Sequence, residues 1–188
     1  ALDVFESYQF TVLHAPNVDD AKVYSLCAEY TKRRRDTDGV KFQTVISNVD
    51  KIAYDYEGIV SVSNIGKFNN ADAHMSYWVA GAIAGCAVNK SCTNMTYDGE
   101  LEPVVETKQT VLEQLILDGH FAFHNVDDKI NVLTDINSLV TVTKEKGKDF
   151  KKNQVIRVID ERANYVARCY NNDFLGKVQN DKAGRVSF

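Results

Sequence analysis

Short apolar runs alternate with amphipathic stretches along the first half of the chain. Residues 9–13, 42–46 and 58–62 are brief runs rich in β-branched and aromatic side chains, which predicts three strands. Apolar positions three to four residues apart predict a helix over residues 20–35, and a second helix is expected over residues 72–88. Strands that alternate with helices at this spacing indicate crossover connections and a largely parallel sheet. The predicted fold class of this half is therefore α/β.

The expected helix at residues 72–88 contains many small side chains, including Gly81 and Gly85. Glycine inside a helix costs up to about 1 kcal/mol relative to alanine. Two glycines one turn apart therefore predict that another part of the backbone packs closely against this helix.

Pro103 follows a polar stretch and marks an expected boundary between an α/β part, residues 1–103, and a smaller α+β part, residues 104–188. In the second part, an apolar helix face ends at Asp118-Gly119. Alternating residues 120–134 then predict a hairpin. A long helix is expected from about Lys148.

Composition narrows the possible classes of protein. The 188 residues are 44% hydrophobic and 26% charged, which suits one large or two small folded domains and excludes a disordered chain. The net charge of −4 argues against a protein that coats nucleic acid or a membrane surface. The longest apolar run, residues 78–88, is too short to cross a bilayer. Without a recognisable signal peptide, the expected place of synthesis is a cytoplasm.

Charge divides unevenly along the chain. Residues 1–103 carry 9 basic and 14 acidic side chains, whereas residues 104–188 carry 13 and 12. A basic cluster lies at the start of the last helix, where the helix dipole disfavours cations; it consists of Lys144, Lys146, Lys148, Lys151 and Lys152. This cluster either faces an acidic partner or simply keeps the surface soluble.

Motifs for catalysis, cofactors and metals are missing from the sequence. The phosphate-binding loops, the nucleophile elbow and the zinc-protease motif do not occur. Four cysteines lie far apart, which favours neutral or buried thiols over a metal site. His120 and His124 would share an exposed strand face about 13 Å apart, too far to bind one metal. We therefore expect no catalytic, cofactor or metal-binding residues.

Three segments resemble the tail sheath proteins of contractile phages and of related phage-tail-like bacteriocins. These are the small-residue run at 77–85, the stretch 135–160 that begins DINSL, and the segment 172–178 that reads NDFLGKV. The resemblance implies a subtilisin-like α/β domain without a catalytic triad, followed by an α+β domain beside the tail tube. It also implies a structural role rather than an enzymatic one: a sheath that contracts to drive the tube through a cell envelope.

The resemblance further implies the partners. Sheath subunits form hexameric rings around the tube, exchange terminal strands with neighbours and respond to a baseplate. On this chain the implied tube-facing contacts are Lys148, Lys151, Lys152 and Arg157. The comparison also implies a fragment that lacks its terminal strand arm and is monomeric alone. The whole protein would be assembled in the bacterial cytoplasm and would reside in the virion tail.

Two other classes of protein stay open at this point. A small cytosolic α/β enzyme would need a reactive thiol, with Cys86 or Cys92 as the candidates. A binding domain of a larger regulatory protein is the third possibility.

Overall fold

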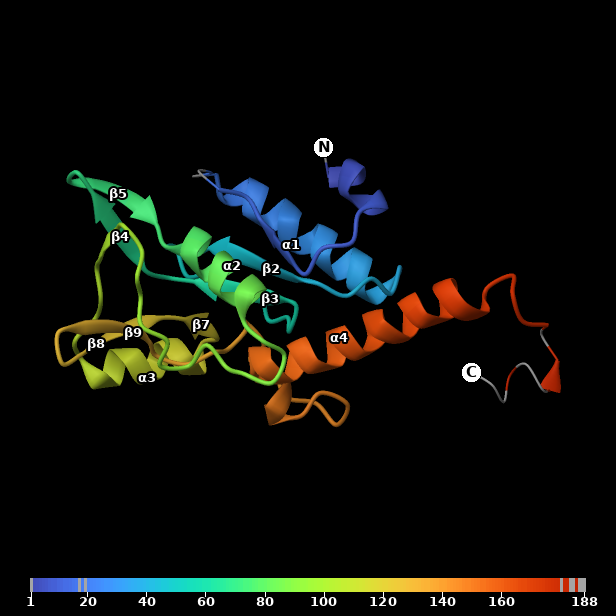
Figure 1. Ribbon diagram of the computed structural model, residues 1–188. Coiled ribbons are helices and arrows are strands. Elements are labelled where there is room, and N and C mark those ends of the chain that lie inside the picture. The colour runs from blue at the N-terminus through green and yellow to red at the C-terminus, as the bar shows by residue number, and fades with distance from the viewer. Residues whose placement is uncertain (1, 17, 19, 180, 183–184, 186–188) are drawn as a thin grey trace.

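A parallel four-stranded sheet lies at the centre of the protein (Figure 1). The structure is a computed structural model that describes residues 2–16, 18, 20–179, 181–182 and 185. The strand order of this sheet is β1-β2-β3-β7, and every neighbouring pair of strands is parallel. The strands are β1 (Val12–His14), β2 (Gln43–Ser47), β3 (Ile59–Val62) and β7 (His120–Phe121). The three strands expected in the first half are confirmed to within a few residues.

Two helices cover opposite faces of this sheet. On β2, Ile46 packs with Tyr24 and Ala28 of α1 (Ala21–Asp36). The adjacent Val45 points the other way and packs with Val79 of α2 (Ser76–Gly85). Neighbouring strand residues point to opposite faces, so a strand buried on both sides reads as a continuous apolar run.

Asp72 does not begin a helix as the sequence predicts. It lies in β5 (Ala71–His74), which pairs with β4 (Ile65–Phe68) in a second, antiparallel sheet of order β5-β4-β6. Asn69 and Asn70 join these strands with φ values of 50° and 64°. Asparagine tolerates this left-handed conformation better than most residues, so the pair forms a tight hairpin turn.

Pro103, the expected boundary, does not coincide with a break in the packing. It lies in β6 (Glu102–Pro103), which pairs with β4. After it come α3 (Gln109–Leu117) and β7, which completes the parallel sheet beside β3. Phe121 and Phe123 share one buried cluster with residues of β2, β3 and α2. The core of the α/β part therefore continues well beyond residue 103.

A separate two-stranded sheet follows β7. Strands β8 (Phe123–Val126) and β9 (Lys129–Val132) form the expected hairpin. Gly119 ends α3 as expected, with φ +76°, and a Cβ there would lie 2.9 Å from the backbone oxygen of Ser138. Short helical turns occur at η1 (Leu2–Ser7), η2 (Lys148–Lys151) and η3 (Tyr170–Phe174).

The glycines of α2 do not make the close approach that the sequence predicts. A Cβ placed on Gly81 or on Gly85 would meet nothing within 4 Å. The helix instead buries Ser76, Val79, Ala80 and Ile83, and its two glycines lie at the surface.

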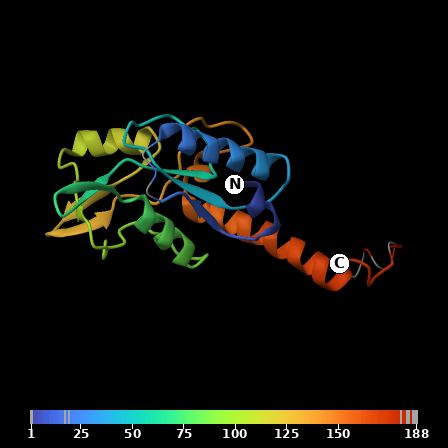
Figure 2. The same cartoon turned by 90° about the horizontal axis from the view of Figure 1, so that it is seen from above.

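Helix α4 (Asn153–Cys169) crosses the amino-terminal end of the parallel sheet. Its first residue, Asn153, bonds Gln43 at the start of β2. Both views show the second half of the helix extending away from the rest of the protein (Figures 1 and 2).

A buried ion pair joins α4 to α1. The Arg35 guanidinium donates to both carboxylate oxygens of Asp160, at 2.6 and 2.9 Å, and also to the carbonyl of Phe42. Only 5% and 10% of the two side chains are exposed. Burial raises the pKa of Asp160, an effect that the Arg35 guanidinium opposes. Two residues 125 positions apart are thus held in one fixed geometry.

We expect Asp160→Asn to lower the free energy of unfolding by about 3 kcal/mol, because it leaves the buried Arg35 charge without a counterion. Urea denaturation followed by circular dichroism measures this loss. The matched control is Glu161→Gln on the same helix, whose partner Arg168 is partly exposed and which should cost about 0.5 kcal/mol. Equal losses for both variants would contradict the role of the buried pair.

Candidate functional site

Polar side chains line the face of α4 that contacts the rest of the protein. They are Asn153, Arg157, Asp160 and Asn164, spaced three to four residues apart along one side of the helix. Asn164 donates to the carbonyl of Lys41 at 3.0 Å, and Asn153 bonds both Gln43 and Asp135. Hydrogen bonds, together with the buried side chain of Ile156, therefore hold this helix in place.

Asp135 is the centre of the second group of contacts to α4. Its side chain is 1% exposed and accepts from Arg157 Nη2 at 3.1 Å and from Asn153 Nδ2 at 2.9 Å. It also accepts from the backbone N–H of Cys92 at 2.9 Å and from the Ser91 hydroxyl at 3.3 Å. One carboxylate therefore connects α4 to the turn that follows α2.

The apolar side of α4 faces solvent. We call Val158, Ile159, Tyr165, Val166 and Tyr170 the α4 apolar stripe; each is at least 42% exposed. These residues recur at helical spacing on the side opposite Asn153, Arg157 and Asp160. An amphipathic helix normally buries its apolar side, so this reversed orientation marks the stripe as a candidate contact surface. The spacing of these residues was visible in the sequence, but the direction in which they point was not.

The structure separates the four residues expected to face a tail tube. Lys148 and Lys151 lie in η2 and Lys152 directly precedes α4, where it pairs with Asp149 at 3.7 Å. Arg157 does not belong to this exposed group, because its guanidinium bonds Asp135 and the carbonyl of Lys90. The sequence spacing did not reveal that Arg157, four residues after the start of α4, reaches the buried carboxylate of Asp135.

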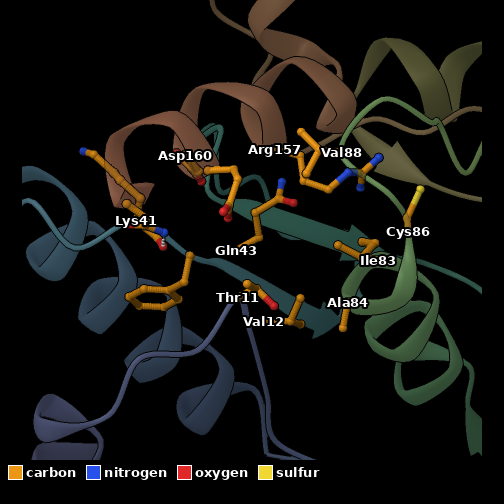
Figure 3. Close-up of a pocket in the computed structure, with 13 residues that line it drawn as sticks. Thr11, Val12, Lys41, Gln43, Ile83, Ala84, Cys86, Val88, Arg157 and Asp160 are labelled. Atoms are coloured by element: carbon orange, nitrogen blue, oxygen red, sulfur yellow. Dashed lines mark hydrogen bonds between the residues drawn. The ribbon is translucent and has the colours of Figure 1, made fainter. Parts of the chain in front are cut away.

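A small cavity lies between α4, the end of α2 and the beginning of β2 (Figure 3). Gln43, Ile83, Cys86, Arg157 and Asp160 are among the residues that line it. Its volume of about 130 Å³ has room for a few water molecules or one side chain. Pockets for small-molecule ligands are usually larger, about 300 to 1,000 Å³.

Histidines gather at the carboxyl-terminal end of the parallel sheet. His120 is buried, against the expectation of an exposed face, and its Nδ1 lies 3.0 Å from Ser61 Oγ. His124 lies in the separate strand β8. Burial lowers the pKa of His120 and of His14. Nδ1 of His74 lies 2.5 Å from Ser47 Oγ, and both residues line a small pocket at the end of β2.

The two candidate thiols do not resemble catalytic nucleophiles. Cys92 is fully buried, and burial together with the Asp135 carboxylate raises the pKa of its thiol to about 12. Cys86 donates to backbone carbonyls of Ala87 and Lys90. A reactive cysteine needs a depressed pKa. Within the described part of the chain, no cluster of histidine, cysteine and acidic residues is arranged to hold a metal ion. None of the helices described here has the length and apolar character needed to cross a membrane.

Comparison with known proteins identifies the family. The family model for the phage tail sheath protein central domain matches residues 1–138. The chain belongs to the phage tail sheath protein family. Among curated relatives, the phage-like element PBSX protein XkdK of Bacillus subtilis (strain 168) is 34% identical over 169 residues, which is 87% of this chain.

Solved sheath structures share this fold. The sheath tail protein of Desulfitobacterium hafniense superposes with a TM-score of 0.86 over 99% of the chain at 32% identity. The helical sheath of the anti-feeding prophage in its contracted state gives a TM-score of 0.68 over 97% of the chain at 15% identity, a likeness of fold alone. This chain covers 36% of the Bacillus relative and 44% of the Desulfitobacterium chain, so it spans less than half of each. The mixed α/β fold is therefore that of sheath proteins.

We expect the chain to lose stability as the pH falls from about 7 to 5. The folded state lowers the pKa of His120 through burial, whereas the unfolded chain binds a proton near the ordinary histidine value of about 6.5. The unfolded state therefore holds more protons below that pH, and the urea midpoint should move down. His120→Gln should reduce this shift, and His124→Gln, outside the parallel sheet, should keep it. An unchanged shift in His120→Gln would contradict the assignment.

Proposed function

We propose that this chain is part of a structural subunit of a contractile tail sheath, which surrounds a tail tube and shortens to drive the tube through a host cell envelope. The observation that carries the proposal is the family match over residues 1–138, together with the superposition of nearly the whole chain on a solved sheath protein. The protein would be a tail component of the particle, assembled in the bacterial cytoplasm.

We infer a non-enzymatic role. Cys92, the first candidate nucleophile, is buried and has a raised pKa. Cys86, the second, donates a hydrogen bond to a backbone carbonyl. Fold likeness to a hydrolase would not imply its activity either, since function depends on the site rather than on the fold. We also propose that the α/β part has the subtilisin-like fold that the family resemblance implies.

We further propose that the division between the two parts lies near residue 138 rather than at Pro103. The parallel sheet extends through β7, and Ser138 still donates its backbone N–H to the carbonyl of Ile59 in β3. The family model ends at the same residue. Segment 139–179 with α4 would then begin the smaller α+β part that lies nearer the tube.

The subunit would use two different surfaces around α4. Lys148, Lys151 and Lys152 remain candidate contacts for an acidic tube surface, and Arg157 is left out because it bonds Asp135. The α4 apolar stripe would be buried against other sheath polypeptide, including strands contributed by neighbouring subunits of a hexameric ring. Without those neighbouring strands, the chain alone is expected to be a monomer. In the assembled sheath, the trigger for contraction would come from a baseplate.

Immunogold electron microscopy tests the function directly. Antibodies raised against this chain should decorate the sheath of contractile tails in particles from the strain that encodes it. Labelling should follow the sheath from its extended to its contracted length. Tails that stay unlabelled while the antibody binds another cell fraction would overturn the proposal.

The α4 apolar stripe can be tested in the same strain. We expect Val158→Glu with Val166→Glu to abolish sheathed tails, because two charges would have to be buried in the assembled particle. The free energy of unfolding of the isolated chain should change by no more than about 0.5 kcal/mol, because both positions are exposed in it. Counting sheathed tails in negative stain measures the effect.

Lys151→Glu with Lys152→Glu is the charge control for that experiment. These variants should still form sheathed tails, with altered sensitivity to salt, because exposed ion pairs contribute only about 0 to 1 kcal/mol each. Normal tails from the valine variants would show that the stripe is not an assembly surface.

A further inference from the structure

Strand β5 forms an open edge of the antiparallel sheet. In the order β5-β4-β6, only one side of β5 has a partner strand in the described part of the chain. The carbonyl of Ile65 in β4 accepts from the N–H of Val104, on the β6 side. Bonded positions alternate along an antiparallel strand, so the next residue of β4, Gly66, bonds toward β5 through its partner Ala73. Asp72, one position before Ala73, therefore points its N–H and carbonyl away from β4, along the open edge.

A groove of about 570 Å³ lies beside this edge. Its lining includes Asp72, Ala73 and His74 of β5, together with Ser76 and Tyr77 at the start of α2. This volume falls within the range of about 300 to 1,000 Å³ that is usual for ligand sites, unlike the small cavity beside α4. The groove therefore has room for several side chains of a partner.

Ser76 gives this groove a hydrogen-bonding group without a partner. Its side chain is fully buried, and its Oγ makes no hydrogen bond within the described residues. Buried hydroxyl groups are normally hydrogen-bonded. A polar group that entered the groove and bonded Ser76 would therefore gain an interaction that the chain alone does not supply.

Exposed aromatic and acidic side chains line the same groove. Phe68 and Tyr77 are 51% and 42% exposed. Asp72 and Glu100 are exposed carboxylates that form no ion pair with any residue that the structure describes. Burial lowers the pKa of His14, which also lines the groove, so this imidazole adds no positive charge at neutral pH. The surface is therefore suited to a ligand that is both basic and apolar.

We propose that this groove binds an extended peptide segment that alternates basic and apolar residues and adds as a strand to the open edge of β5. The backbone of the segment would bond the N–H and carbonyl of Asp72. Because neighbouring residues of a strand point to opposite faces, its basic side chains would lie beside the Asp72 carboxylate. Its apolar side chains would lie on the other face, where the small side chains of Ala71 and Ala73 leave Phe68 within reach. The inference rests on β5 and its groove and does not depend on the role of the chain in a sheath.

The test uses a short peptide of alternating lysine and valine with blocked ends. It is titrated at low salt into the ¹⁵N-labelled chain, and amide signals are followed by nuclear magnetic resonance. The signals of Asp72 and Ser76 should shift as the peptide binds. A glutamate–valine peptide of the same length should bind at least about tenfold more weakly, because its charge repels that of the groove.

Two N-methylated versions of the lysine–valine peptide test the strand pairing itself. One carries the methyl groups on the lysine amides and the other on the valine amides. Only one of these two sets of N–H groups can face β5 in a strand pair. One version should therefore lose at least about tenfold in affinity while the other binds like the parent peptide, a difference that attraction between charges alone does not produce.

Paired variants of the chain test the charges. Asp72→Asn with Glu100→Gln should weaken binding by about tenfold at low salt, because two exposed carboxylates are lost. The matched control is Asp127→Asn with Asp128→Asn, which changes the net charge equally in the turn between β8 and β9. Both control positions have positive φ values, 49° and 60°, which asparagine tolerates. This control should keep the affinity of the parent chain.

Four results would overturn the proposal. The first is no shift at Asp72 at about 1 mM peptide, and the second is equal binding of both N-methylated peptides. The third is equal loss of affinity in the two double variants. The fourth is a shift of the Asp72 and Ser76 signals with chain concentration in the absence of peptide, which would show that a second copy of the chain occupies the groove.

Discussion

The buried polar contacts of α4 determine how the rest of the protein can be used. Arg35 donates two hydrogen bonds to Asp160 with almost no exposure to water, and Arg157, one turn earlier on α4, donates to the buried Asp135. Charges inside a protein are costly to desolvate and gain net stability only in well-defined geometry. These hydrogen bonds all leave one face of α4, so they determine which side of the helix meets the rest of the protein. The orientation of its apolar stripe toward solvent follows from that constraint.

The α4 apolar stripe and the lysines of η2 would contribute very different free energies to a contact. Fully burying a valine, isoleucine or aromatic side chain contributes about 1.5 to 3 kcal/mol, so the stripe offers several times that amount. Exposed lysine contacts contribute about 0 to 1 kcal/mol each and weaken with salt. In the contractile sheath proposed above, the stripe would suit permanent contacts, and the lysines of η2 would suit contacts that are broken.

Local sequence patterns predicted the framework well. The strands at β1, β2 and β3, helix α1 and the end of α3 at Gly119 follow from periodicity and from turn residues. The failures concern long-range partners. Asp72 joins a strand because Ile65–Phe68 pairs beside it, and Gly81 is exposed because Val79 and Ile83 face the sheet.

The candidate site was harder to foresee than the framework. Arg157 looked like part of a basic surface because its partner, Asp135, lies 22 residues away in the sequence. His120 looked exposed because a strand pattern does not reveal that its face meets Ser61 of β3. The helical spacing of the α4 apolar stripe could be read directly, but a usual helix would bury it. Only the contacts of its polar side establish the opposite orientation.

The two ends of the parallel sheet carry different kinds of residues. Open α/β sheets usually bind ligands at the carboxyl ends of their strands. Here that end holds Ser47 against His74 and Ser61 against His120, and each hydroxyl lies within hydrogen-bond distance of a histidine Nδ1. The amino end, which most enzymes of this class leave to structural packing, holds the anchored helix that carries the exposed stripe. The α4 apolar stripe, the proposed assembly surface, therefore lies at the end of the sheet opposite the usual site for ligands.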